Sequence, residues 1–153
     1  MARQWTPAQT DAIRARGGSL LVSAAAGSGK TAVLVERVLE RLTDPEHPTA
    51  ADRLLVVTFT RAAAAEMSAR ISRQIALLLE ENPRDVHLQR QQIRMARAHI
   101  STIHSFCGDL VREFFYKLEI TPDFRILDDS EMAVLRAHAV EEVLEGYYGR
   151  GDE

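Results

Sequence analysis

The sequence predicts an α/β fold in which a parallel sheet carries helices on its faces. Three short apolar runs, at residues 19–23, 54–59 and 98–103, have the length of buried strands, although the third is mixed in composition. Longer stretches with apolar residues at helical spacing follow these runs. Because strands and helices alternate, successive strands are expected to lie parallel in one sheet, with the helices packed against it.

Prolines and glycines mark the ends of the expected helices. Pro7 stands in the first turn of the first helix, where proline is tolerated, and two glycines at residues 17–18 end that helix. Pro45, Pro83 and Pro122 interrupt the chain between later elements. The helices are expected at residues 6–15, 31–42, 62–79, 86–97, 106–118 and 128–148.

The composition is that of an ordinary globular protein. Of the 153 residues, 46% are hydrophobic and 27% are charged, so disorder is not expected. No apolar run approaches the ~20 residues of a membrane span, and no apolar signal segment follows Met1. The single cysteine, Cys107, excludes an intrachain disulfide and a cysteine zinc site, and it favours a reducing cytoplasm.

Charge is unevenly distributed along the chain. The formal net charge of −3 argues against a protein coated in basic residues for nucleic acid. Residues 1–118, however, carry 16 basic and 12 acidic side chains, a charge of +4, whereas residues 119–153 carry 3 and 10, a charge of −7. We therefore expect a motif-bearing domain at residues 1–118, followed by an acidic helical segment at residues 119–153.

The strongest functional signal is the segment Ala24-Ala25-Ala26-Gly27-Ser28-Gly29-Lys30-Thr31. It follows an expected strand and precedes an expected helix, which is the setting of a phosphate-binding P-loop. The glycines let backbone N–H groups turn toward phosphate oxygens at the helix N-terminus. Lys30 is expected to reach the β- and γ-phosphates of ATP, and the Thr31 hydroxyl to bind Mg²⁺. The strict motif begins with glycine, where this chain has Ala24.

Gln9 lies upstream of this loop, in the segment Thr6-Pro7-Ala8-Gln9. Its amide combines a donor and an acceptor, which matches the N6/N7 edge of adenine. The chemistry of the side chain alone leaves open the alternative that Gln9 is a solvated helix residue.

Four segments together resemble superfamily 1 DNA helicases of the UvrD/Rep/RecB kind. Two are the segment ending at Gln9 and the glycine loop, where these helicases favour alanine at the position of Ala24. The third, Val57-Thr58-Phe59-Thr60-Arg61-Ala62-Ala63-Ala64-Ala65-Glu66-Met67, is similar to their motif Ia. The fourth, Ser101-Thr102-Ile103-His104-Ser105-Phe106-Cys107, is similar to motif Ib. Their order and spacing agree over residues 1–118.

The resemblance implies a P-loop NTPase (RecA-like) parallel sheet with flanking helices, of which this chain holds the N-terminal part of domain 1A. It implies that Gln9 reads adenine, that Lys30 and Thr31 act in catalysis, and that Thr31 is a metal ligand for Mg²⁺. The implied ATP-binding residues are Gln9, Ala24, Ala25, Ala26, Gly27, Ser28, Gly29, Lys30 and Thr31. The implied single-stranded DNA contacts are Phe59, Thr60, Arg61 and His104, with Arg61 standing where relatives usually carry asparagine.

Within this family, the alanine run at residues 62–67, the segment 101–107 and residues 120–129 are most similar to the AddA group, the helicase–nuclease subunits of AddAB recombination complexes. This implies an ATP-dependent DNA helicase with exonuclease activity in the full-length protein, acting on duplex ends in double-strand break repair. It also implies a partner of the AddB type and a bacterial cytoplasm, at the nucleoid. The alternatives are a UvrD/Rep-type helicase without nuclease, a small nucleotide kinase, and a non-catalytic nucleotide- or DNA-binding module.

The chain itself is expected to bind nucleotide weakly and not to hydrolyse it. The family's Mg²⁺-binding aspartate, catalytic glutamate, arginine finger and nuclease carboxylates have no counterpart in its motifs. Residues 124–129 end an apolar run in aspartate, as the Mg²⁺-holding strand of an NTPase does. Arg125 interrupts that run and Asp129 suits the start of the last helix, so we reject this interpretation.

Structural alternatives compete with several of the implied contacts. Phe59 ends an expected buried strand, so core packing competes with base stacking. His104 lies at a strand-to-helix turn, where a lone histidine is more often a structural hydrogen-bonding residue. Ser101, Thr102 and Ser105 are candidates for capping the following helix or for binding a backbone phosphate.

A basic stripe is formed by Arg90, Arg94 and Arg97, which recur at helical spacing. A solvated helix face is favoured over a DNA-facing groove for these three arginines.

Overall fold

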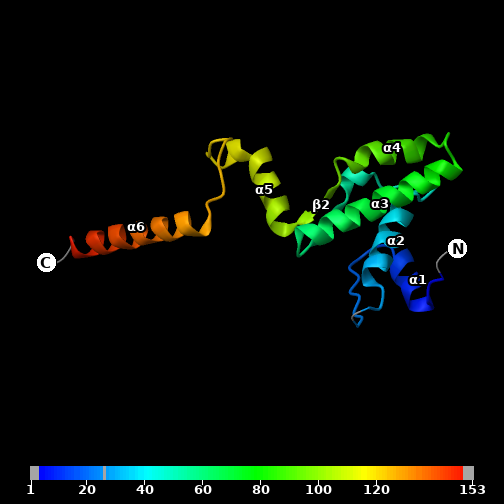
Figure 1. Ribbon diagram of the computed structural model, residues 1–153, viewed down its shortest axis with the longest axis horizontal. Helices are drawn as coiled ribbons and strands as arrows, with labels where there is room; N and C mark the ends of the chain where they lie inside the picture. The colour runs from blue at the N-terminus through cyan, green and yellow to red at the C-terminus, as the bar shows by residue number, and fades with distance from the viewer. Residues whose placement is uncertain (1–3, 26, 150–153) are drawn as a thin grey trace. The chain divides into compact units, whose positions relative to one another are not determined.

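The computed structural model describes residues 4–25 and 27–149, and it divides into two compact units. Unit 1 is Met1–Leu110 and unit 2 is Val111–Glu153. Unit 1 holds a small parallel sheet with helices packed around it, so the chain is a helix-rich α/β protein (Figure 1). Among the described helices, none is long and apolar enough to cross a membrane.

The sheet of unit 1 consists, over the described residues, of β1 (Leu55–Thr58) and β2 (His99–Thr102). The strands are parallel, and their register pairs Leu55 with His99 and Thr58 with Thr102. Both strands were expected from the sequence, within one or two residues of these ends. The connection between them runs through α3 (Arg61–Glu81) and α4 (Val86–Met95), which lie side by side (Figure 1).

The core of unit 1 lies between the sheet, α3, and α2 (Lys30–Leu42). α3 buries one residue per turn: Ala64, Met67, Ile71 and Ile75. Ile71 and Ile75 of α3 and Leu42 of α2 are fully buried, and burying such a side chain contributes about 1.5–3 kcal/mol. These contacts hold the C-terminal part of α2, α3 and the sheet in one unit.

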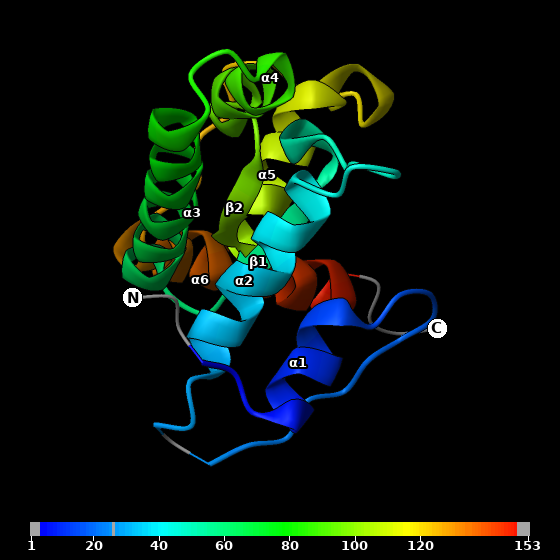
Figure 2. The same ribbon diagram turned by 90° about the vertical axis from the view of Figure 1, so that its right-hand side faces the viewer.

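The first helix, α1 (Pro7–Arg14), packs beside α2 (Figure 2). Ala12 and Ile13 of α1 are buried with Val33 of α2, and Trp5 packs against this small cluster. Thr6 caps α1 in a capping box with Gln9, and Pro7 occupies the first turn as expected. A second cluster therefore fixes α1 to the helix that begins at the glycine loop.

The expected strand at residues 19–23 is wrong: this segment has no regular secondary structure and pairs with neither described strand. Leu21 is 94% exposed, and Leu20 and Val22 are about half exposed. A strand needs neighbours for its N–H and C=O groups, and here β1 and β2 pair with each other instead. The apolar pattern identified a segment suited to a buried strand, but no neighbouring strand lies beside it.

Local capping residues locate the helix ends more accurately than the apolar pattern does. α5 (Ile103–Glu113) begins earlier than expected because Thr102 caps it: the Thr102 hydroxyl accepts from the N–H of Ser105 at 3.2 Å. It also ends earlier, and a short 3₁₀ turn, Phe115–Lys117, follows. α3 and α4 lie where helices were expected, with ends shifted by one or two residues.

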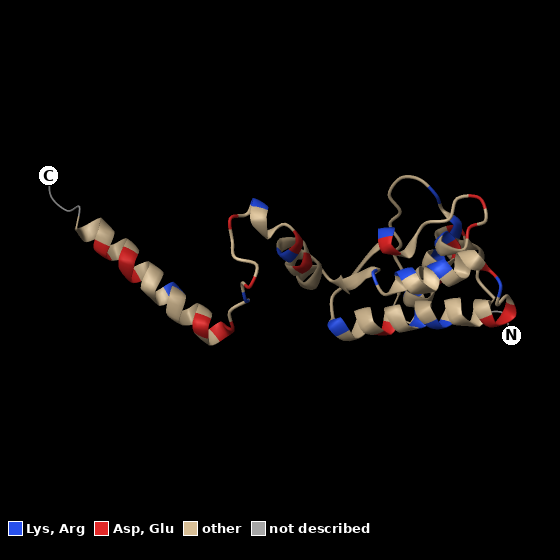
Figure 3. Ribbon diagram, turned by 90° about the horizontal axis from the view of Figure 1, so that it is seen from above, with Lys and Arg blue, Asp and Glu red and all other residues tan. Residues whose placement is uncertain are grey.

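Unit 2 contains the 3₁₀ turn Phe115–Lys117 and α6 (Asp129–Tyr148). Asp128 caps α6 in a capping box with Glu131, so the aspartates here begin a helix and do not end a strand. This confirms the rejection of residues 124–129 as a metal-holding strand. Acidic residues recur along α6, which carries much of the −7 charge of residues 119–153 (Figure 3).

Candidate functional site

The glycine loop leads directly into α2, in the backbone conformation that its glycines allow. Gly27 has φ 76° and Gly29 has φ 86°, both in the left-handed region where a side chain is strained. The N–H of Ser28 donates to the carbonyl of Ala25 at 3.3 Å and closes a turn. A Cβ at Gly27 would meet nothing within 4 Å, so the space beside the loop is open to a ligand.

Lys30 is the first residue of α2 and folds back over the loop. Its ammonium group donates to the carbonyl oxygens of Ala24 at 2.6 Å and Ala25 at 2.7 Å. Thr31 follows it in the first turn and is exposed. The Lys30 cation therefore lies at a helix N-terminus, whose first N–H groups have no partner within the helix and where phosphate groups bind favourably. Ala26 lies outside the described residues.

Gln9 joins α1 to the glycine loop. Its Oε1 accepts from the N–H of Thr6 at 2.9 Å, and its Nε2 donates to the carbonyl of Ser28 at 3.2 Å. These two partners fix which way the amide faces, since exchanging oxygen and nitrogen would set like groups against each other. One N–H and one lone pair of the Gln9 amide remain for a ligand beside the glycine loop.

The expected DNA contacts come from the carboxyl ends of the two paired strands. Phe59, Thr60 and Arg61 follow β1, and His104 follows β2. Because Thr58 and Thr102 pair in parallel register, these residues lie at the same edge of the sheet. Ligands of open parallel sheets bind at this edge.

The side chains at this edge differ in their exposure and bonding. Phe59 is completely exposed, so packing in the core does not explain it. The Thr60 hydroxyl accepts from the N–H of Ala63 at 3.1 Å and caps α3, so it already has a structural role. Arg61 and His104 are exposed. An exposed aromatic ring suits stacking on a base, and an exposed arginine two residues further along suits contact with a phosphate.

Arg90 and Arg94 of the basic stripe lie on α4, Arg97 lies in the turn that follows it, and all three are exposed. Arg94 lies 4.0 Å from the carboxylate of Asp52, a solvent-exposed ion pair of little energetic weight. The structure brings no part of the glycine loop or of Phe59 into hydrogen bonding with these arginines among its described contacts. Their exposure is compatible with both a solvated face and a DNA-facing surface, so the solvated face favoured from the sequence stays a prediction.

Sequence reasoning missed the arginines of α2 that hold α1. Arg37 donates through one nitrogen, Nη1, to the carbonyls of Ala12 at 2.5 Å and Ile13 at 3.2 Å, and Arg41 donates through Nη2 to Ala15 at 3.1 Å. Burial lowers the pKa of Arg37, and the nearby charges of Arg41 and Arg16 lower it further. The only sequence signal was their spacing, one turn apart on a helix.

A family model for the UvrD/REP helicase N-terminal domain matches residues 5–148. The chain therefore belongs to the UvrD/REP helicase family. This agrees with the class indicated by the glycine loop, the capped Gln9 segment and the residues gathered at the strand ends.

Three similar proteins are each named as an ATP-dependent helicase/nuclease subunit. The chain is 52% identical to that of Pelotomaculum thermopropionicum over 152 residues, which is 99% of this chain and 12% of the relative. It is 52% identical over 143 residues to that of Moorella thermoacetica, covering 94% of this chain and 10% of the relative. It is 49% identical over 150 residues to the protein of Clostridioides difficile, covering 98% of this chain and 12% of the relative. The chain thus spans about an eighth or less of the length of these relatives.

Proposed function

We propose that this chain is the ATP-binding N-terminal part of an AddA-type, ATP-dependent DNA helicase and nuclease. The observation that carries the proposal is the geometry around Lys30, whose ammonium group lies over an open glycine loop at the start of α2. Residues 1–118 then form part of a RecA-like P-loop domain, and residues 119–153 lead onward from it.

ATP fits the residues present. The triphosphate would replace the carbonyls of Ala24 and Ala25 as partner of Lys30, and the carbonyl of Ala25 as partner of the Ser28 N–H. The N–H groups of Gly27 and Gly29 would add to this cradle. The free N–H and lone pair of the Gln9 amide match the N7 and N6 positions of adenine. The bonds of the amide to Thr6 and Ser28 limit its rotation, which supports the proposed match.

Mg²⁺ enters this proposal with the nucleotide. No group of three His, Cys, Asp or Glu side chains able to hold a metal ion is found among residues 4–25 and 27–149. The Thr31 hydroxyl, exposed in the first turn of α2, is one protein ligand for a cation whose other ligands are phosphate oxygens and water.

Single-stranded DNA is proposed to run along the carboxyl edge of the sheet. Phe59 offers a ring for base stacking, and Arg61 and His104 offer groups for phosphate contact at the same edge. In the full-length protein, ATP hydrolysis is proposed to drive movement along DNA in partnership with an AddB-type protein, in the cytoplasm.

The test is binding of a fluorescent ATP analogue to the chain and to Lys30→Ala, with Mg²⁺ present. We expect the dissociation constant to rise at least about tenfold, because a hydrogen bond to a charged group contributes about 1.5–3 kcal/mol. The matched control is Lys117→Ala, which removes the chain's other lysine, in unit 2. Equal affinities for the unchanged chain and Lys30→Ala would contradict the proposal.

A further inference from the structure

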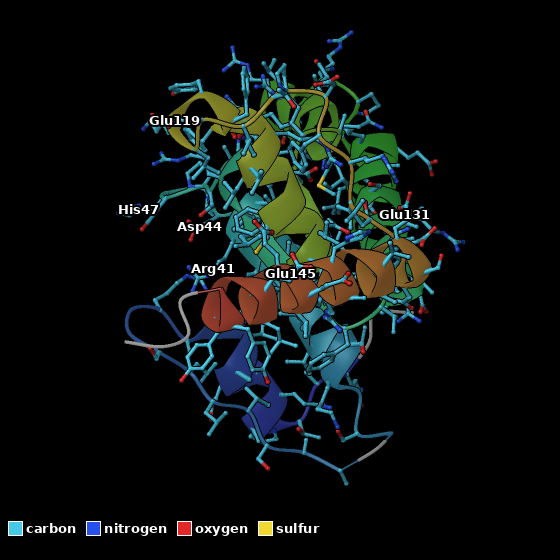
Figure 4. The ribbon with its side chains drawn as sticks, turned by 90° about the vertical axis from the view of Figure 1, so that its left-hand side faces the viewer. Arg41, Asp44, His47, Glu119, Glu131 and Glu145 are labelled. Carbon is cyan, nitrogen blue, oxygen red and sulfur yellow. The ribbon has the colours of Figure 1, made fainter. Side chains whose placement is uncertain are left out.

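The C-terminal end of α1 is held by two arginines of α2. The last carbonyls of a helix have no partner inside that helix. Here Arg37 provides a partner for Ala12 and, together with Arg16, for Ile13, and Arg41 provides one for Ala15. A cation at this end is also favoured by the helix dipole. Arg41 lies at the end of α2 with Asp44 just beyond it (Figure 4).

The other end of α1 carries Gln9, whose amide donates to Ser28 in the glycine loop. α1 has only eight residues, and a helix this short has no stable position of its own in water. Its position is therefore set by what it touches: the Ala12, Ile13 and Val33 cluster, the arginines at one end, and the loop at the other.

Ion pairs around the same helix end are weaker candidates for this role. Arg14 lies 3.5 Å from Glu40, and Arg16 lies 3.9 Å from Glu40 and 3.6 Å from Asp44. The Arg14 side chain is 73% exposed, and exposed pairs at such distances contribute little. Arg37, by contrast, is partly buried and contacts the backbone of α1 directly.

We propose that Arg37 is a positioning residue for adenine recognition, which it serves by holding α1 so that the Gln9 amide stays beside Ser28. This inference rests on the proposed ATP site and deepens it. Arg37 touches neither the proposed base nor the phosphates. It acts through the backbone of α1, with Arg41 adding a second bond at the next turn.

The test compares ATP with ITP, which carries an oxygen in place of the N6 amino group. The unchanged chain is expected to prefer ATP about tenfold, since a matched pair of hydrogen bonds contributes about 1–3 kcal/mol of discrimination. Arg37→Met keeps the apolar stem but no donor. This substitution is expected to weaken ATP binding about tenfold. The affinity for ITP is expected to change less than about twofold, so the preference for ATP disappears. Arg37→Lys restores a donor and is expected to retain the preference.

Two further measurements separate positioning from simple destabilisation. Trp5, the chain's single tryptophan, packs on the α1 cluster, so its emission without nucleotide is expected to shift to the red in Arg37→Met and not in Arg37→Lys. Arg41→Met removes only the bond to Ala15 and is expected to cause the same loss of preference to a smaller extent. It carries the test if Arg37→Met does not fold. Arg73→Met, at an exposed position of α3, is the control. It is expected to change neither the preference for ATP nor the emission of Trp5.

The outcomes distinguish this inference from the proposed function. An ATP preference that survives in both Arg37→Met and Arg41→Met would overturn the inference, as would an equal loss of ATP and ITP binding in them. Failure of the unchanged chain to bind either nucleotide would instead contradict the proposed ATP site, and the inference with it.

Discussion

Gln91 of α4 accepts a hydrogen bond from the backbone N–H of Ala51 at 2.9 Å, and both residues are almost completely buried. The amide nitrogen of Gln91 donates to the carbonyls of Leu42 at 2.9 Å and Thr49 at 2.8 Å. A single side chain thus provides partners for three backbone groups in the connection between α2 and β1. Buried backbone groups need such partners, and this connection has no regular structure except the 3₁₀ turn Ala51–Arg53.

We expect Gln91→Ala to lower the free energy of unfolding of the chain by ~3 kcal/mol. The carbonyl of Leu42 keeps His87 Nε2 as a partner at 2.6 Å, so the substitution leaves the N–H of Ala51 and the carbonyl of Thr49 without one. Each buried backbone group without a partner costs about 1–3 kcal/mol, and access of water to the group recovers part of that cost. Urea denaturation followed by circular dichroism measures the change. Gln92→Ala is the matched control, because Gln92 is the exposed neighbour on the same helix and should change stability by less than ~0.5 kcal/mol. A loss below ~1 kcal/mol in Gln91→Ala would contradict this role.

The importance of Gln91 was not visible in the sequence. The helix at residues 86–97 was expected, but Gln89, Gln91 and Gln92 are equivalent in composition, and only the packed structure shows which one faces inward. The same holds for Arg37, since a sequence does not show which carbonyls lie opposite an arginine. The roles of Gln91 and Arg37 both depend on contacts between segments distant in the sequence, which a local sequence pattern does not reveal.

Local signals predicted the capped and glycine-rich parts of the fold well. The capping boxes at Thr6 and Asp128 begin helices where expected, and the two glycines of the loop adopt positive φ. These features depend on residues within a few positions of one another. The strand at residues 19–23 failed because a strand depends on distant neighbours, and its apolar side chains remain exposed without them.

The exposed ring of Phe59 leads to a prediction about single-stranded DNA. Phe59→Ala should weaken binding of an oligonucleotide about tenfold, since stacking of one base contributes about 1–3 kcal/mol. Stability should stay unchanged, because the ring is fully exposed and buries no area in the protein. Fluorescence anisotropy measures the binding, and Phe59→Trp should preserve it. The control Ile93→Ala removes another exposed apolar side chain, on α4. Equal losses in Phe59→Ala and Ile93→Ala would exclude a specific stacking site.

The start of α6 should respond to acid. A hydrogen bond from the Ser130 hydroxyl lowers the pKa of Asp128, as does a bond from the N–H of Glu131. Two bonds from Arg125, at 2.5 and 2.6 Å, lower the pKa of Glu131, which lies at the first turn of the helix (Figure 4). A lowered pKa in the folded state stabilises that state above the ordinary carboxyl pKa of about 4, and the effect is lost as pH falls through the lowered value.

We therefore expect the first turn of α6 to fray as pH falls below about 4. Amide exchange at residues 129–132 measures the fraying, with far-UV circular dichroism as a second readout. In Asp128→Ala the first turn should already be frayed at pH 7 and should change little on acidification. Asp123→Ala, in the preceding loop, should behave like the unchanged chain. Protection of these amides that is the same at pH 7 and pH 2.5 would show that the capping box does not hold the helix.

ATP turnover by the chain should stay at background, with or without single-stranded DNA. Asp128 has the sequence setting closest to a Mg²⁺-holding aspartate, and its carboxylate is instead engaged by Ser130 and the N–H of Glu131 at the start of α6. Lys30 can bind phosphate but does not activate water. Phosphate release measures turnover, and Asp128→Asn should leave it unchanged. Release that DNA stimulates and Lys30→Ala abolishes would show that these 153 residues hold a complete hydrolytic site.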